Sequence, residues 1–567
     1  MGIIALSESD CEDCHRCVRN CSLKAIGIKN GQAEVVEEKC IYCGQCIDVC
    51  PQNAKEVSNQ LTSLEQKLNN NKLVASLAPS FVAAFDAGPA QIVAGLKKLG
   101  FSAVEETAVG AEKIADYYQK LLEQRRKPVI SACCPAVVNL IEKHYPDLIS
   151  YLADSVSPMV AHGKLIQNKY DDAEVVFIGP CIAKLDEVTW QVAEEVDLAI
   201  TFNQLEELFA KHNINLQQLK SSSFDDELSS WAASFPVQSG VLKAADIEST
   251  FNSEIITVSG LDECKNTFED ILAGEIEPQF VEAMICSGGC INGPGLSSES
   301  GVHARKEKII NYTKALKTEE RAERKIDSDK IEINLKRDYK NKKETEEMPS
   351  ENQIRSILSQ LGKFNPEDEL DCGGCGYDTC REKAIAVYQG YAENKMCIPY
   401  MKGKLESLAD IIVKSSPNAI IVVDKDMIIQ KFNPKANELF NFRKEYPIGN
   451  KLERYIDPED FIKVWEDKRR ISQKKVEYEQ YDVVVEKSIL PLADYELVVG
   501  ILTDVTDRER QKEKVAEMKE ETLEKANQVI NKQMKVAQEI ASLLGESTSE
   551  TKVILHELRE LMKEEGV

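Results

Sequence analysis

Short apolar runs alternate with amphipathic helical stretches between about residues 73 and 295. The runs that resemble buried strands are residues 73–77, 129–132, 175–178 and 198–200. Apolar runs of this length, spaced by helical segments, are typical of a parallel sheet with both faces covered by helices. The pattern therefore predicts an α/β domain over about residues 72–300.

Three of these runs are followed by residues that can do chemistry. Pro79 and Ser80 follow the first run, Cys133 and Cys134 the second, and Cys181 the third. Ligands of open parallel sheets bind at the carboxyl ends of the strands. We therefore expect these side chains to border a cofactor crevice.

The C-terminal part has a different pattern. Apolar runs at residues 419–423, 427–432 and 497–502 alternate with short helices, which predicts an α+β domain over about residues 405–505. From about residue 508 to 544 the chain is helical and highly charged. One seam recurs there every seven residues: Val515, Thr522, Val529, Val536 and Leu543. The repeat favours a parallel coiled-coil dimer, although Thr522 and Gln533 weaken it, and a shorter helix completes a helical output segment over 506–567.

Residues 301–350 carry charges of both signs and few apolar side chains. Such composition is typical of a solvated linker or an exposed helix. We expect a charged linker between the α/β domain and the C-terminal part.

Composition limits the classes of function. The chain has 567 residues, of which 43% are hydrophobic, so several globular domains are expected. A net charge of −25 argues against nucleic acid as a partner. The first residues have no signal-peptide pattern and no run reaches the ~18 apolar residues of a membrane span, which favours a cytoplasmic protein with no membrane partner. Cytoplasmic thiols stay reduced, so the 18 cysteines point to metal binding.

The first 57 residues contain eight cysteines in two copies of one spacing. They are Cys11, Cys14, Cys17 and Cys21, then Cys40, Cys43, Cys46 and Cys50. This is the spacing of bacterial two-cluster ferredoxins, in which the fourth cysteine of each run binds the other cluster. We expect a two-cluster ferredoxin domain over residues 1–57. One 4Fe–4S cluster would bind Cys11, Cys14, Cys17 and Cys50, and the second Cys40, Cys43, Cys46 and Cys21.

A compact third set lies within about residues 351–402. Its members are Cys372, Cys375, Cys380 and Cys397. Four thiolates also suit zinc. The glycines around the first two cysteines allow close turns about a cluster, and the run resembles a small 4Fe–4S domain family, which implies a third cluster there.

The fourth set is scattered along the α/β region: Cys134, Cys181, Cys286 and Cys290. Their surroundings read SACCP, GPCIAKLDE and EAMICSGGC, which resemble the three H-cluster motifs of FeFe hydrogenases, TSCCP, MPCxxKxxE and ExMxCxxGC, in order. The resemblance implies that these four cysteines hold a 4Fe–4S cluster. It also implies that Cys290 bridges to a two-iron subcluster carrying CO, cyanide and a bridging dithiolate.

The same resemblance implies roles for five neighbours. Cys133 would transfer protons to and from the subcluster, Lys184 would hydrogen-bond a cyanide and Met284 would pack beside it, while Pro79 and Ser80 would contact cyanide and the dithiolate. The alternatives are a redundant thiol for Cys133, a surface lysine for Lys184 and ordinary core packing for Met284. Cys264 has no partner set and is expected to be a buried free thiol.

Several residues depart from the active members of that family. Gly179 stands where they have methionine, which would open space beside the two-iron site, and Ala153 and Met159 stand where a serine and a glutamine are usual. The acidic proton relay has no secure equivalent, and the candidates are Glu112, Asp116 and Glu123. Loss of relay groups slows proton transfer by orders of magnitude, so we expect intact cofactor binding with low turnover.

Residues 405–505, with SSPNAIIVVD at 415–424 and the closing DVTD at 504–507, resemble a PAS domain. The segment contains neither His nor Cys, so haem and a flavin–thiol adduct are not expected and no PAS ligand is predicted. His556 resembles a kinase phospho-acceptor, but no ATP-binding domain follows it, so a plain helix is expected.

Together these features resemble a sensory, PAS-containing FeFe hydrogenase. The resemblance implies reversible heterolytic H2 cleavage, relay of electrons through four 4Fe–4S clusters, and a signal that passes through the PAS domain and coiled coil of a homodimer to a kinase, cyclase or phosphatase. The alternatives are a catabolic hydrogenase linked to ferredoxin, and a non-enzymatic iron–sulfur redox sensor that lacks the two-iron subcluster.

Overall fold

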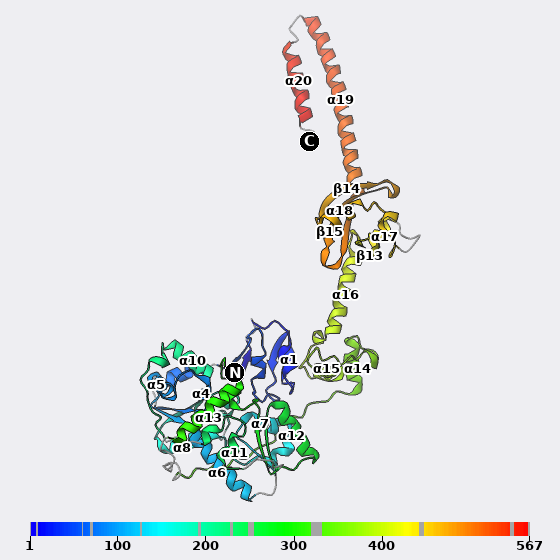
Figure 1. Cartoon of the computed structure of the whole chain (residues 1–567). Coiled ribbons are helices and arrows are strands. Elements are labelled where there is room, and N and C mark those ends of the chain that lie inside the picture. Colours follow the sequence, from blue (N-terminus) through cyan, green and yellow to red (C-terminus); the bar gives the residue numbers. More distant parts are fainter. Residues whose placement is uncertain are drawn as a thin grey trace. The chain divides into compact units, whose positions relative to one another are not determined.

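The computed structural model describes the chain except residues 1, 7–9, 59, 69–71, 125–127, 191–193, 227–230, 248–253, 319–330, 441–446, 545–548 and 565–567. The chain divides into two compact units, residues 1–401 and 402–567. Figure 1 shows the elements of each unit.

A four-stranded parallel sheet forms one half of the α/β region. Its strands are ordered β6 (Ala103–Glu106), β5 (Leu73–Leu77), β8 (Glu174–Gly179) and β9 (Leu198–Thr201). Every residue of β5 is buried, as a continuous apolar run requires when helices cover both faces of a parallel sheet. Three of the four predicted strands therefore lie side by side.

The strand before Cys133 belongs to a second parallel sheet. The order there is β10 (Ile255–Ser259), β11 (Phe280–Met284) and β7 (Val129–Ile130). The sequence analysis did not identify β10 or β11, since both mix apolar with polar residues. Two sheets, rather than one, position the candidate site.

Helices pack around both sheets. The longer ones are α5 (Pro89–Leu99), α6 (Ala108–Gln124), α7 (Pro135–His144), α8 (Pro158–Lys169), α10 (Phe202–Lys211) and α12 (Leu261–Ala273). Helices α6 and α8 cross closely at Gly110, where a Cβ atom would lie 2.4 Å from the carbonyl oxygen of Pro158. Only glycine allows this approach.

The N-terminal ferredoxin-like domain is built from two similar halves. Strand β1 (Ile4–Leu6) pairs antiparallel with β4 (Lys55–Val57), and β2 (Ile26–Lys29) pairs with β3 (Gln32–Val35). Two short helices, α1 (Arg16–Asn20) and α2 (Gln45–Asp48), carry the cysteine runs and pack against each other. The domain docks on α7, because Lys143 Nζ donates to the carbonyl oxygen of Cys40 at 2.6 Å.

The third cysteine set lies between α14 (Glu351–Gln360) and the start of α16 (Ile398–Ser415), with α15 (Cys380–Tyr388) in its middle. This small domain packs on the ferredoxin-like domain. The amide of Ile28 donates to the Tyr391 carbonyl at 2.9 Å, and Lys24 Nζ donates to the Gly376 carbonyl at 2.6 Å.

The charged segment 301–350 contains a helix, and most of its described side chains are exposed, although a few are buried. Helix α13 (Val302–Thr318) buries Ile309 completely. Residues 331–347, called the strap below, then run along the α/β region: Val156 donates its amide to Leu335 at 2.8 Å, and Tyr339 donates its hydroxyl to the Ser155 carbonyl at 2.6 Å. Lys342 of the strap, whose side chain is 39% exposed, forms a 2.6 Å ion pair with the buried Glu142, so part of the strap's positive charge is paired with the α/β region.

The second unit is built on a five-stranded antiparallel sheet. The order is β13 (Ile429–Phe432), β12 (Ala419–Asp424), β16 (Leu497–Asp504), β15 (Val483–Leu492) and β14 (Ile471–Tyr478). Helices α17 (Pro434–Phe440) and α18 (Glu459–Asp467) complete its core. Three of these strands were predicted, whereas β14, whose residues are mostly exposed, and β15 were not.

Helix α19 (Thr506–Leu544) follows this sheet and α20 (Ser549–Glu564) ends the described chain. Along α19 the seam residues Val515, Val529 and Val536 are 53%, 59% and 45% exposed. The coiled coil stays a prediction, because its partner helix would belong to another molecule. None of the described helices combines the length and the apolar character needed to cross a membrane.

Candidate metal centre

A cavity of about 100 Å³ lies where the strands of both sheets end. The residues that follow β5, β6, β7 and β8, together with Met284 at the end of β11, line it. This confirms that the residues after the predicted strands share one crevice. The predicted site residues in its wall are Pro79, Ser80, Cys133, Cys134, Cys181, Lys184, Met284 and Cys290.

The four scattered cysteines meet at this cavity. Cys134 caps the start of α7, where Pro135 occupies the first helical position, and Cys181 follows β8. Cys286 and Cys290 flank a tight turn in which Gly289 has a φ of 103°, and a Cβ atom there would lie 2.4 Å from the Pro236 carbonyl oxygen. Cys286 is not in the cavity wall but interacts electrostatically with the other three.

The donor set of this cluster fits an iron–sulfur group. Burial, followed by the charge of the neighbouring Cys134, raises the pKa of Cys181 to about 12. Buried thiols that lie close together lose their protons readily only when a metal cation replaces those protons. Thiolates of this number are the usual ligands of a 4Fe–4S cluster.

Lys184 is anchored by a carboxylate. Its ammonium group lines the cavity and donates to Glu187 Oε2 at 2.6 Å, and both side chains are buried. The surface-lysine alternative is therefore wrong. Glu187, one helical turn after Lys184, is the partner that a buried ammonium needs. This role of Glu187 was not predicted from the sequence. Arg337 of the strap approaches the other Glu187 oxygen at 4.0 Å.

Cys133 is hydrogen-bonded from behind by a tyrosine. The Tyr118 hydroxyl lies 3.3 Å from the sulfur of Cys133, and its oxygen accepts from the Ala132 amide at 2.9 Å and from Ser155 Oγ at 3.4 Å. Because that oxygen already accepts two hydrogen bonds, its own proton points to Cys133. Burial, the largest cause, raises the pKa of Cys133 to about 12. Sequence reasoning missed Tyr118 and Ser155, since neither belongs to a motif.

The candidate acidic relay residues do not gather here. Asp116 and Glu123 are exposed on α6, and Glu112 is half-buried. Instead, Glu106 is fully buried at the end of β6, next to the cavity residue Thr107. Burial raises the pKa of Glu106 to about 8, although Tyr312 donates to it at 3.3 Å. Glu106 could have been identified in the sequence as one of two consecutive acidic residues at the end of an apolar strand.

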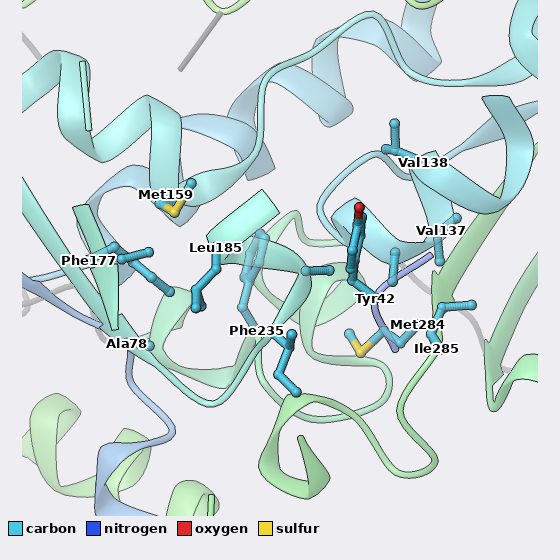
Figure 2. Packing of buried hydrophobic residues seen from close by; sticks show 14 of the residues in the cluster. Tyr42, Ala78, Val137, Val138, Met159, Phe177, Leu185, Phe235, Met284 and Ile285 are labelled. Carbon is cyan, nitrogen blue, oxygen red and sulfur yellow. The ribbon is translucent and has the colours of Figure 1, made fainter. Parts of the chain in front are cut away.

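The remaining predicted residues take ordinary positions in the wall. Ser80 is buried, and its hydroxyl has no hydrogen-bond partner among the described residues. Met284 packs in the apolar cluster of Figure 2, which also labels the cavity residues Met159, Phe177 and Phe235. Cys264 is fully buried and its thiol donates to the Met284 carbonyl at 3.5 Å, as expected for a free thiol.

Gly179 does not open space at the cavity. A Cβ atom at this position would lie 2.6 Å from the Phe177 ring and 3.1 Å from Ala78 Cβ. The aromatic ring therefore fills the room that a longer side chain at residue 179 would take. This corrects the expectation of an enlarged site.

The ferredoxin-type cysteines sort as their spacing predicts. Cys14 and Cys50 both reach Gln52 Oε1, at 3.6 and 4.0 Å. In the other set, Cys21 acts electrostatically on Cys40, Cys43 and Cys46. Each run thus contributes its fourth cysteine to the other set.

The third set also converges. All four of its cysteines line a cavity of about 20 Å³, together with the lysines Lys363 and Lys383. Lys383 is buried and donates to the Glu393 carbonyl at 2.5 Å. Four thiols in one small cavity beside two cations suit an anionic metal–thiolate group.

Comparisons with known families agree with this arrangement. Residues 71–294 match the iron only hydrogenase large subunit, C-terminal domain. Residues 33–56 match a 4Fe-4S binding domain, 368–399 an Fe-S cluster family, and 410–484 the PAS fold. The matches contain the second ferredoxin-type cysteine run, the whole third and fourth cysteine sets, and part of the second unit.

The relatives are distant. The NADP-reducing hydrogenase subunit HndD of Solidesulfovibrio fructosivorans is 25% identical over 50% of this chain, and the match spans 63% of that subunit. The periplasmic [Fe] hydrogenase large subunit of Nitratidesulfovibrio vulgaris is 27% identical over 53% of this chain and 87% of its own length. The nuclear prelamin A recognition factor of Mus musculus is 21% identical over 48% of this chain and 76% of its own.

Iron–sulfur clusters and the hydrogenase-type fold follow from these matches and from the cysteine geometry. The three cysteine motifs, the cavity that they line and the PAS match lie on one polypeptide. The chain is a PAS-containing FeFe hydrogenase-like protein.

Proposed function

We propose that this chain is an H2-sensing FeFe hydrogenase of low turnover. The observation that carries the proposal is one cavity lined by Cys133, Lys184 and three of four clustered cysteines, in a chain that also has a PAS domain. By the family's motif Cys134, Cys181, Cys286 and Cys290 would hold a 4Fe–4S cluster. Cys290 would bridge it to the two-iron subcluster with CO, cyanide and a bridging dithiolate.

When bound, the H-cluster supplies reversible heterolytic cleavage of H2. The protein's own residues hold the surroundings. Glu187 fixes the Lys184 ammonium at the cavity wall, where it can face an anionic ligand, and Ser80 keeps an unpaired hydroxyl there. Met284 and Pro79 contribute apolar surface to the same wall.

Proton movement supports the low turnover. Cys133 would take and return protons at the cavity, and the only described groups that hydrogen-bond behind it are the hydroxyls of Tyr118 and, through it, Ser155. Burial and the neighbouring Cys133 raise the pKa of Tyr118 well above its usual range. A relay works best when its pKa lies near the ambient pH, so hydroxyls in place of a carboxylate slow the transfer.

Electrostatic contacts support an electron route toward the second unit. Cys43 of the ferredoxin-like domain acts on Cys286 of the cavity set. Cys21, also of the ferredoxin-like domain, interacts electrostatically with Tyr377. Tyr377 in turn interacts with Cys375 of the third set. Electrons would thus pass from the cavity through the ferredoxin-type clusters to the third cluster, which precedes α16 and the PAS domain.

The output belongs to another molecule in this proposal. A homodimer formed through the PAS domain and α19 would present the signal to a kinase, cyclase or phosphatase in the cytoplasm. A ferredoxin would serve as the redox partner. Reduction of the third cluster would shift the equilibrium between two conformations of the PAS domain.

Infrared spectroscopy of anaerobically matured protein tests this function. We expect CO and cyanide stretches that shift under H2, together with slow H2 oxidation. Rapid turnover with reduced ferredoxin would instead identify a catabolic hydrogenase. Protein that binds iron and sulfide but never shows these stretches would identify a non-enzymatic redox sensor.

A further inference from the structure

A lysine occupies an inward position in the ferredoxin-like domain. Lys55 begins β4 and pairs with Leu6 of β1, and its side chain is only 4% exposed. The next residue, Glu56, points outward, as strand alternation requires. The pleat therefore directs the Lys55 ammonium group into the domain.

This ammonium group has no hydrogen-bond partner among the described residues. The other lysines buried to a similar degree all have one. Lys184 donates to Glu187, Lys383 to the Glu393 carbonyl, and Lys363 to the Asp368 carbonyl, while Lys487 forms an ion pair with Asp460. A buried ammonium without a partner is strongly unfavourable, so its site calls for a negative group.

The negative groups nearby are cysteines of two different sets. Lys55 acts electrostatically on Cys17, which belongs with Cys11 and Cys14, and on Cys46, which belongs with Cys40 and Cys43. These two cysteines lie on α1 and α2, which pack together, and α2 also packs on β4. One cation thus faces the ligands of both predicted clusters.

We propose that Lys55 is a shared counter-charge that raises the reduction potentials of both N-terminal iron–sulfur clusters. A cluster held by four thiolates is anionic, and reduction adds one more negative charge. A fixed cation nearby stabilises the reduced state more than the oxidised state, and low-dielectric surroundings strengthen the effect. The inference requires iron–sulfur clusters at these cysteines but not H2 chemistry.

The test is a redox titration of the full chain carrying Lys55→Met. Clusters are reconstituted anaerobically without the two-iron subcluster, in a Cys375→Ser background that removes the third cluster, and reduction is followed by electron paramagnetic resonance. At a fixed potential, the reduced-to-oxidised ratio of both N-terminal clusters should fall about tenfold, equivalent to about 59 mV for one electron. Lys55→Arg should restore the ratio to within about threefold, since it retains the charge.

The matched control is Lys29→Met, which removes an exposed lysine of β2 in the same domain and should leave the ratio unchanged. An unchanged ratio in Lys55→Met, or an equal fall in Lys55→Arg, would overturn the proposal. If Lys55→Met loses its clusters, the iron contents of this variant, Lys55→Gln and Lys55→Arg decide whether the positive charge is required. Loss in Lys55→Met and Lys55→Gln with retention in Lys55→Arg supports a charge requirement, whereas loss in all three overturns it. These readouts are independent of hydrogenase activity.

Discussion

Tyr118 directs its hydroxyl proton to the sulfur of Cys133, 3.3 Å away, because its oxygen already accepts from Ala132 and Ser155. The two residues come from different elements, α6 and the segment after β7. The tyrosine therefore sets which direction the thiol proton of Cys133 can take, toward the cavity rather than toward the sheet.

Tyr118→Phe should lower H2 turnover by about 10²-fold, within the range expected for one proton-transfer group. Infrared bands of the matured cofactor should be unchanged, since the tyrosine is no ligand. Tyr117→Phe is the matched control, because that hydroxyl donates to the Asp154 carbonyl instead. Equal turnover in Tyr118→Phe and wild type would remove the tyrosine from the relay.

Cys133→Ala should abolish most turnover while iron and sulfide content stay at the wild-type level. The expected loss of turnover is about 10²–10⁴-fold, because the Cys133 thiol lines the cavity and is the group that Tyr118 hydrogen-bonds there. Cys264→Ala serves as control, because Cys264 is a buried thiol that donates to a backbone carbonyl. Unchanged turnover in Cys133→Ala would make this thiol redundant.

Glu106 should make the first unit less stable as the pH rises. Burial raises its pKa in the folded protein to about 8, above the ordinary value of 4.5. The folded state therefore holds a proton that the unfolded state releases between these values, so stability is lost as pH rises from about 4.5 to about 8, by up to about 1.4 kcal/mol per pH unit. Thermal unfolding of wild type and Glu106→Gln from pH 5 to 8 measures this, and the variant should lose most of the slope. Parallel pH profiles would contradict the assignment.

Glu187→Gln should destabilise the first unit strongly. The change leaves the buried cations Lys184 and Arg337 without the carboxylate that both approach. Removing one partner of a buried ion pair typically costs about 3–5 kcal/mol. Lys184→Met combined with Glu187→Gln should recover part of the melting temperature. No recovery in the double variant would show that the two side chains are not coupled.

Val529→Lys with Val536→Lys should convert a dimer to a monomer if α19 forms a coiled coil. Both side chains are exposed in the single chain and lie seven residues apart. Light scattering after size-exclusion chromatography measures the mass, and Lys532→Ala off the seam is the control. A wild-type monomer would contradict the predicted dimer.

Much of the fold follows from apolar patterning. Strands β5, β8 and β12 were predicted almost residue for residue because each is an unbroken apolar run. Strand β10 was not predicted because it mixes apolar with polar residues, and β14 was not predicted because most of its residues are exposed. A strand with no buried face leaves no periodic signal.

The candidate site, like the fold, could be predicted from the sequence only in part. Cysteine spacing predicted which thiols gather, because ligand chemistry requires several cysteines in fixed register. Tyr118 and Ser155 could not be predicted, since a single hydroxyl carries no pattern and reaches Cys133 only through helix packing. The position of Phe177 beside Gly179 was not predicted for a related reason. A small residue in a motif does not indicate which neighbouring side chain fills the space.

The strap has a consequence for how the chain may be divided. The hydrogenase match ends at residue 294, yet Leu335, Tyr339 and Lys342 complete the surface around Ser155 and Glu142. A chain cut after residue 300 would remove Lys342 from the buried Glu142, and it would remove Arg337 from Glu187, which would keep its ion pair with Lys184. The segment that matches the hydrogenase family is therefore shorter than the segment that packs together, and residues 71–294 alone would lack the strap's contacts.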